Sequence, residues 1–319
     1  MDWKDRRQMV KIAKLYYLES WTQSEISKKV GLSRPIISKM LHQAKEAGIV
    51  EIYINDETLH TVELENKIEK KYGLKDAVVV ASANHGAELI KRRIGQAAAS
   101  YVAKKLDHIT KMGISWGKSM YSFIDEFPSQ NQENVHLVPM IGGMGSNYVH
   151  LHSNHLTFHL AQKLNTTSSY LHAPAMVETD DLKQRLMNSK DIAEVIEEGR
   201  EVDIAVVGVG IPSSQSTMAE MGYFAKEDIH SLKKADAAGD INSQFYNAQG
   251  EDISHPLNKR TIALTLEDLD NIPEVIAITD GVEKVESLHA ALTGGCIQVL
   301  VTDDQMAQAL IEYYDEEKE

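Results

Sequence analysis

Residues 22–50 constrain the fold of this chain more than any other segment, because helix-start and helix-stop signals follow one another there at short spacing. Thr22 and Glu25 form a Thr-x-x-Glu capping box, which begins a helix by satisfying two backbone N–H groups. Gly31 can end that helix, and Ser33 can cap a second one directly after it. Two short helices joined by a tight turn predict a helix-turn-helix.

The second helix of this pair has two distinct faces. Its apolar side chains recur at helical spacing and form an inward stripe, made of Ile37, Met40, Leu41 and Ala44. The outer face is polar and cationic, and in a helix-turn-helix that face meets base edges in the major groove of DNA. The predicted DNA-contacting residues are Arg34, Pro35, Ser38, Lys39 and His42. A helical hairpin with a solvated outer face is the alternative.

The flanks of the motif complete a small domain. Apolar residues at helical spacing over 9–17 predict a first helix, and alternation over 49–54 predicts a short strand suited to a wing. A helix over 59–72 follows, which could connect domains or pair between subunits. We therefore predict a winged helix-turn-helix domain over 1–56 and a second domain over 57–319.

The distribution of charge supports this division. The net charge of −14 separates into about +3 for residues 1–56 and −17 for the remainder. Contacts to DNA phosphates need local positive charge, whereas an acidic body weakens non-specific attraction to DNA. The chain thus reads as a DNA-facing head on a larger domain with another task.

Residues 57–319 alternate between apolar strands and helices, which is typical of a mostly parallel, Rossmann-like α/β sheet covered on both faces. The predicted strands span 77–81, 109–115, 135–140, 168–172, 203–208, 261–265, 274–279 and 297–302. The predicted helices span 88–105, 118–126, 152–164, 191–199, 283–292 and 304–314.

Ligands of such sheets bind beyond the carboxyl ends of the strands, and several loops there have suitable chemistry. The candidate residues are Ser115 and Trp116 in the first loop and Gly142, Gly143 and Ser146 in the second, and a third loop spans 208–214. The spacing matches neither a Walker motif nor a dinucleotide fingerprint. Each loop taken alone also fits a tight turn between a strand and a helix.

Two further loops carry charge. Lys284 lies at the start of a predicted helix, where backbone N–H groups and an ammonium suit a phosphate. Asp240 and Asn242 supply a carboxylate and an amide for sugar hydroxyls. A solvated lysine and an ordinary polar turn are the alternatives.

Other classes of function find little support in the sequence. His152, His155 and His159 share one helix face but lack a Cys partner or an H-E-x-x-H motif, so we predict no metal and no cofactor. Neither a nucleophile elbow nor an acid/base pair stands out, so we predict no enzyme. The N-terminus lacks a signal core, no apolar run reaches membrane-spanning length, and the single Cys296 fits a reducing cytoplasm.

The chain resembles the SorC family of sugar-responsive bacterial transcriptional regulators over essentially its whole length. The resemblance rests on residues 16–52, on GISWGKSM from Gly113, on GDINSQFYNAQG from Gly239 and on the run from Leu264 to the DGVEK motif and beyond. It implies a tetrameric DNA binder with a non-catalytic effector domain, similar in fold to sugar-phosphate isomerases and deaminases. By position, Lys284 would contact the effector's phosphate, Asp240 and Asn242 its sugar, and Gly142 with Gly143 would line the pocket.

Two positions depart from the family pattern. In the lysine turn, residues 280–284, Asp280-Gly281 replaces the usual Gly-Gly before Lys284, which places a carboxylate near any phosphate. Ser243-Gln244-Phe245-Tyr246 replaces Gly-Arg-Phe-Phe, so the effector can differ.

The sequence therefore predicts a cytoplasmic regulator of a carbohydrate-utilisation operon. Its expected partners are double-stranded operator DNA, a phosphorylated sugar and further copies of the chain in a homo-oligomer, with no membrane. The rivals are a sugar-phosphate isomerase or deaminase carrying an accessory head, and a metal-responsive regulator that uses the face of His152.

Overall fold

The computed structural model describes residues 3–50, 59–82, 86–214 and 216–318. The chain divides into two compact units, residues 1–59 and 60–319. The predicted domain boundary at 56/57 and most of the predicted wing at 49–54 lie outside the described residues. In the part of the chain that the structure covers, no helix is long and apolar enough to cross a membrane.

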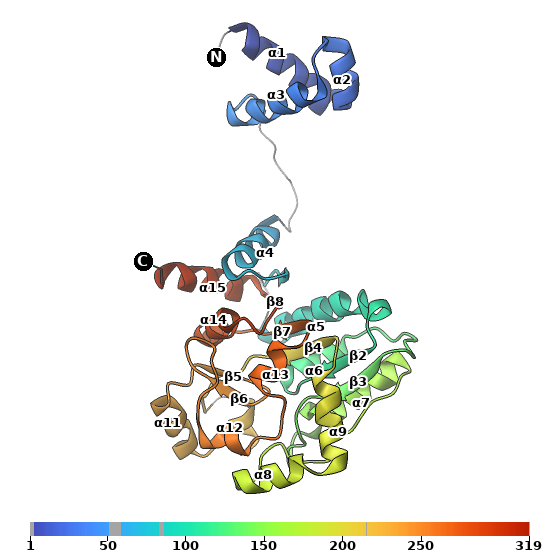
Figure 1. Ribbon diagram of the computed structural model, residues 1–319. Coiled ribbons are helices and arrows are strands. Elements are labelled where there is room, and N and C mark those ends of the chain that lie inside the picture. Colours follow the sequence, from blue (N-terminus) through green and yellow to red (C-terminus); the bar gives the residue numbers. More distant parts are fainter. Residues whose placement is uncertain (1–2, 51–58, 83–85, 215, 319) are drawn as a thin grey trace. The chain divides into compact units, whose positions relative to one another are not determined.

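In the described residues of the smaller unit, the helices α1, α2 and α3 include the predicted helix-turn-helix (Figure 1). α1 (Trp3–Ala13) runs into a π-helical turn, η1 (Lys14–Leu18), and α2 (Gln23–Val30) and α3 (Arg34–Glu46) follow. The capping box is present: the Thr22 hydroxyl accepts the Glu25 N–H, and the Glu25 carboxylate accepts the Thr22 N–H. Gly31 ends α2 with φ +72°.

The turn between α2 and α3 is stabilised by the small side chain of Ser27. The Ser27 hydroxyl donates to the Leu32 carbonyl at 2.5 Å, and Leu32 packs on the core of this unit. Ser33 occupies the position before α3, but its side chain makes no capping bond. The core consists of Ile12, Ala13, Leu15, Ile26, Ile37, Leu41 and Ala44.

The larger unit is built on a six-stranded, entirely parallel sheet with the order β1-β8-β7-β4-β2-β3. This confirms the predicted Rossmann-like α/β class. The strands are β1 (Asp76–Val80), β2 (Lys111–Ile114), β3 (His136–Pro139), β4 (Ile204–Gly208), β7 (Glu274–Ile278) and β8 (Val299–Asp303).

Successive strand residues enter two different cores, one on each face of the sheet. Ile204 and Val206 of β4 pack with α5 (Ala87–Ala103), α6 (Lys118–Asp125) and α7 (Ser153–Leu164). Ala205 and Val207 pack on the other face. The helices of that face are α4 (Leu59–Tyr72), α9 (Lys190–Arg200), α14 (Val285–Gly294) and α15 (Asp304–Glu316). Because both faces are covered, the strands are largely apolar, and their charged residues lie at their ends.

Shorter elements lie in the connections. They are η2 (Leu106–His108), η3 (Val149–Leu151), α8 (Asp180–Met187), α10 (Thr217–Glu220), α11 (Lys226–Lys234), α12 (Pro256–Arg260), α13 (Leu266–Asp270) and η4 (Val282–Lys284). The helix predicted over 283–292 thus begins as the 3-10 turn η4 and continues as α14 (Val285–Gly294).

Two predicted strands are wrong. The segment 168–172 makes one isolated bridge, between Ser168 and Leu137 of the edge strand β3. Leu137 donates to the Thr167 carbonyl and accepts from the Ser169 N–H, but the next donor along β3 would be Pro139, which has no N–H. The ladder therefore stops after one repeat.

The segment 261–265 fails as a strand for a different reason. Thr261 bridges to Met176 and Ala263 bridges to Ile141, so the segment touches two partners once each. A hairpin that was not predicted, β5 (Gly239–Ile241) with β6 (Gln244–Tyr246), forms where the sequence indicated a loop.

Candidate functional site

The outer face of α3 carries the residues predicted to contact DNA. Arg34, Pro35, Ser38, Lys39 and His42 are all exposed, whereas Ile37, Leu41 and Ala44 are buried. Within the described residues, neither Arg34 nor Lys39 is paired with a carboxylate, and His42 lies 3.4 Å from Glu46. The face is thus cationic and accessible.

The larger unit contains a cavity of about 240 Å³ at the carboxyl ends of β2, β4 and β7. The chain leaves β2 toward β3 on one side and leaves β4 toward β7 on the other, so the cavity lies at the point where the strand order reverses. Ligands of open α/β sheets bind at this point. Most of the lining comes from residues 115–119, 208–211 and 216–218 and from Asp280, Glu283 and Lys284.

Five of the predicted effector residues line this cavity: Ser115, Trp116, Asp240, Asn242 and Lys284. Ser115 follows β2, and its hydroxyl donates to the Asn242 side-chain carbonyl at 2.5 Å. Asn242 and Ser243 form the two-residue turn of the β5–β6 hairpin, with φ +51° and +59°. Two successive positive φ values define a type I′ turn, which asparagine tolerates well.

Gly210 allows the hairpin to lie against the loop after β4. Its backbone exchanges two hydrogen bonds with Asp240, and a Cβ added at Gly210 would lie 2.2 Å from Asp240 Oδ1. Gly239 similarly faces the hydroxyls of Ser287 and Tyr246, which leave no space for a side chain. These contacts hold the Asp240 carboxylate in the wall of the cavity.

Asp240 is the most perturbed acid of the cavity. Burial raises the pKa of Asp240 to about 6, although a hydrogen bond from the Ser243 N–H and the charge of Lys284 act in the opposite direction. The neighbouring Asn242 Nδ2 is buried and has no hydrogen-bond partner among the residues that the structure describes. The hairpin therefore presents both an acceptor and an unused donor.

Three ammonium groups line the rest of the cavity. Lys284 Nζ lies 3.6 Å from Asp280 Oδ1, and Lys91 Nζ of α5 lies 3.9 Å from Asp280 Oδ2. Lys118 Nζ binds Glu220 at 2.6 Å. Lys91 was missed by the sequence analysis because it lies in the middle of a helix that carries no ligand motif.

Gly142, Gly143 and Ser146 were also predicted to contact the effector, but they are not among the residues that line this cavity. A Cβ added at Gly142 would lie 2.6 Å from the Ala173 carbonyl oxygen, and Gly143 donates its N–H to the same carbonyl. Gly142 thus allows the segment around Ala173 to cross close to the chain after β3, whereas a Cβ added at Gly143 would meet nothing closer than 3.9 Å. Ser146 is exposed in the loop that follows.

On the histidine face of α7, the His152 ring is hydrogen-bonded. His152 Nε2 lies 2.9 Å from the Asn147 carbonyl, and burial lowers the pKa of His152. The rings of His155 and His159 are 6.4 Å apart. Among the described residues, no three His, Cys, Asp or Glu side chains converge to hold a metal ion.

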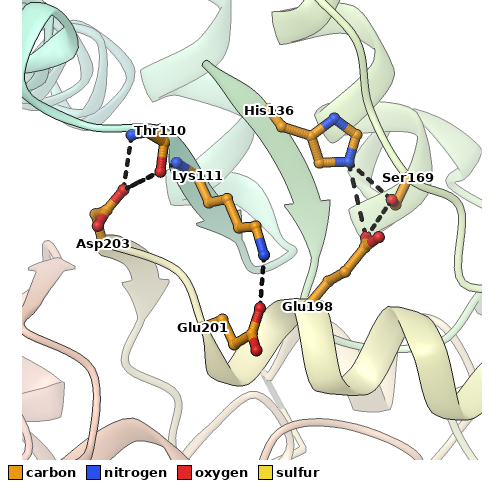
Figure 2. Close-up of polar contacts among 7 residues, drawn as sticks. All are labelled: Thr110, Lys111, His136, Ser169, Glu198, Glu201 and Asp203. Carbon is orange, nitrogen blue, oxygen red and sulfur yellow. Dashed lines mark hydrogen bonds and ion pairs between the residues drawn. The ribbon is translucent and has the colours of Figure 1, made fainter. Parts of the chain in front are cut away.

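A second polar cluster joins the amino ends of β2 and β4 (Figure 2). Asp203 accepts the N–H groups of Thr110 and Lys111 at 2.7 and 3.0 Å, and Lys111 Nζ binds Glu201 at 2.7 Å. Burial alone would raise the pKa of Asp203, but these hydrogen bonds lower it below its ordinary value. The cluster fastens two neighbouring strands.

Figure 2 also shows His136 beside Ser169 and Glu198, which are the residue types of a hydrolytic triad. His136 Nε2 lies 2.9 Å from the Ser169 hydroxyl and 3.7 Å from Glu198, and Nδ1 lies 2.8 Å from Thr167. In a triad the acid holds Nδ1 while the nucleophile faces Nε2. Here the serine and the glutamate face the same nitrogen, so the arrangement is structural.

Comparison with known proteins gives concordant matches. A family model described as "Putative sugar-binding domain" matches residues 56–312. The deoxyribonucleoside regulator of Bacillus subtilis (strain 168) is 32% identical over 311 residues, which cover 98% of this chain and 99% of that protein. The crystal structure of the full-length sorbitol operon regulator SorC from Klebsiella pneumoniae matches with a TM-score of 0.74 and 32% identity, covering 96% and 99%. A DeoR family transcriptional regulator from Listeria monocytogenes matches with a TM-score of 0.74 and 42% identity, covering 78% and 99%.

Proposed function

The chain belongs to the SorC family of sugar-binding transcriptional regulators, and we propose that it controls a carbohydrate-utilisation operon in response to a phosphorylated sugar. Operator DNA would bind to α3 and the sugar phosphate to the cavity at the carboxyl ends of β2, β4 and β7. The protein would act in the cytoplasm, where its operator lies.

The observation that carries the effector class is the polarity of the cavity. Lys284 and Lys91 lie at one side, and the buried Asp240 and Asn242 side chains lie at the hairpin side. Ammonium groups suit a phosphate, whereas a carboxylate and an amide suit hydroxyl groups. A small molecule with a phosphate at one end and hydroxyls at the other satisfies both.

In the head, Arg34, Ser38 and Lys39 would make the principal contacts. Arginine binds guanine edges with two parallel hydrogen bonds, and lysine binds phosphates. We infer a homo-oligomer, with the tetramer of the family resemblance as the expected state. Paired heads then favour pseudo-palindromic sites with half-sites about 10 bp apart, or multiples of that.

The coupling between the two ligands would be a shift between quaternary arrangements. A sugar phosphate that binds one arrangement better than another changes the spacing of paired heads and thus the affinity for DNA. α14 offers a physical link, because it follows the lysine turn η4 and its His289 Nδ1 lies 2.7 Å from the Tyr72 hydroxyl of α4.

A catalytic role has one observation in its favour, which is the pKa of Asp240 near 6. A general base needs such a value near the working pH. Among the cavity residues the other carboxylates, Asp280 and Glu283, belong to the lysine turn, and no histidine lines the cavity. We therefore propose a sensor without catalysis, and a turnover assay on sugar phosphates tests the rival.

Two substitutions test the proposed function separately. Arg34→Ala should weaken operator binding in a gel-shift assay by about tenfold or more, since one bidentate contact is worth about 1–3 kcal/mol. Effector binding, measured by calorimetry, should be unchanged. Lys284→Ala should leave unliganded DNA binding intact but abolish the response to the sugar phosphate.

The effector is found by a thermal-shift screen of the full chain against a panel of phosphorylated sugars, because a ligand of the folded state raises its melting temperature. A protein that distinguishes no promoter fragment from random duplex, with or without these sugars, would refute the proposal. Elemental analysis of the purified chain tests the metal-responsive rival.

A further inference from the structure

The lysine turn of the cavity contains its own anion. The Asp280 carboxylate lies between two ammonium groups, at 3.6 Å from Lys284 Nζ and 3.9 Å from Lys91 Nζ. The three side chains are each about one-fifth exposed and come from α5 and from the turn after β7. A carboxylate held by two lysines occupies the electrostatic position that an incoming phosphate requires.

The remaining charges do not offset this occupation. Lys118, the third ammonium of the cavity, is bound to Glu220 at 2.6 Å. Two further carboxylates, Asp240 and Glu283, line the same cavity. Of these, Glu283 pairs with no cation among the residues that the structure describes. The side chains that line the cavity therefore carry no surplus of positive charge for a dianion.

We propose that Asp280 is a specificity-determining residue that competes internally with the effector's phosphate for Lys284 and Lys91. This inference rests on the proposed function, since it concerns the ligand of the same cavity. To bind, a dianionic group must displace the Asp280 carboxylate from both lysines and remain near it. Asp280 thus lowers the affinity for dianions and raises the effector concentration at which the regulator responds.

The same geometry gives Asp280 a discriminating role. Repulsion between Asp280 and a bound anion grows with the charge of that anion. A doubly charged group is therefore opposed more strongly than a singly charged one of similar size. Replacing Asp280 by an uncharged side chain should increase the affinity for dianions and leave the hydroxyl side of the cavity, at Asp240 and Asn242, unchanged.

The test measures binding of inorganic sulfate, a simple dianion, to the full chain by isothermal titration calorimetry. Asp280→Asn should bind sulfate about tenfold more tightly than the unsubstituted chain, which corresponds to about 1.4 kcal/mol. Glu283→Gln is the matched control, because it removes one negative charge from the same turn but breaks no ion pair, and it should change the affinity by less than about threefold. Adding Lys284→Gln to Asp280→Asn should abolish the gain.

The inference is also supported if Asp280→Asn binds sulfate detectably and the unsubstituted chain does not, because the measured ratio of affinities is then a lower limit. The inference is overturned if Asp280→Asn binds sulfate no better than the unsubstituted chain, whether both bind weakly or neither does. It is equally overturned if Glu283→Gln gives the same gain, because the effect would then come from net charge. A sulfate gain without any sugar-phosphate effect on DNA binding would instead refute the proposed function alone.

Discussion

Replacing Asp240 by asparagine should make the ligand-free protein more stable at neutral pH while weakening its effector site. Asp240 is buried, and its pKa rises from 3.8 to about 6 because the carboxylate loses its hydration. At 1.36 kcal/mol per unit, ionised Asp240 destabilises the folded state by about 3 kcal/mol above pH 6. Asparagine keeps an acceptor for the Ser243 N–H and removes the charge.

The sign of the pH dependence follows from the raised pKa. Between pH 4 and 6 the folded state binds more protons at Asp240 than the unfolded state, so the stability of the unsubstituted chain falls as the pH rises through this window. The cost grows by about 1.5 kcal/mol between pH 5 and pH 8. The stability advantage of Asp240→Asn should grow by the same amount between these pH values. An amide N–H without an acceptor would lower the advantage by about 1 kcal/mol at every pH and leave this growth unchanged.

Urea denaturation followed by far-ultraviolet circular dichroism at about pH 5 and pH 8 measures this difference. Asp236→Asn is the control, because Asp236 is exposed four residues earlier on the same segment and should show no growing advantage. If Asp240→Asn gains no more at pH 8 than at pH 5, then Asp240 is not an ionised buried carboxylate in the folded protein, and the reasoning fails.

Two further substitutions test the packing of the same unit. Gly210→Ala should destabilise the protein by about 1–3 kcal/mol and weaken effector binding, because the new Cβ would meet Asp240 Oδ1 at 2.2 Å. Gly208→Ala is the control: its Cβ would meet nothing closer than 4.0 Å, so it should be nearly neutral in the same denaturation assay. Asp203→Asn should lower the free energy of unfolding by about 1 kcal/mol above pH 5. This difference should disappear as the pH falls through the lowered pKa of Asp203, because the native carboxylate then becomes protonated. A difference that persists in acid would contradict the role of the charge.

The parts of the fold that were predicted correctly are those in which local signals agree with tertiary packing. The capping box of Thr22 and Glu25 forms as expected, and the buried strands β4, β7 and β8 read as apolar runs in the sequence. The segments 168–172 and 261–265 have strand-like composition but lack a continuous partner. Pairing depends on the neighbouring chain, as at Pro139, and composition does not record it.

Asp240 and Asn242 of the candidate site were predicted from the chemistry of their loop, and other residues were predicted because they lie at a strand end or a helix start. Ser115 and Lys284 meet that condition and line the cavity. Lys91 reaches the cavity from a distant helix, and only the folded chain brings it to Asp280. Gly142 satisfies the same sequence rule as Ser115 but serves a close backbone crossing instead, because glycine has this second use.

The cavity concentrates groups that the ligand-free protein leaves unsatisfied, and this links stability to binding. Asn242 Nδ2 has no partner among the described residues, and an unpaired buried donor costs about 1–3 kcal/mol. Asp240 adds the burial of a charge on the same hairpin. A sugar whose hydroxyls accept from Asn242 and donate to Asp240 removes both penalties at once, and it stabilises only the folded state. Substitutions that remove these two unfavourable groups should therefore weaken effector binding, so stability without effector and affinity for effector should change in opposite directions at Asp240 and Asn242.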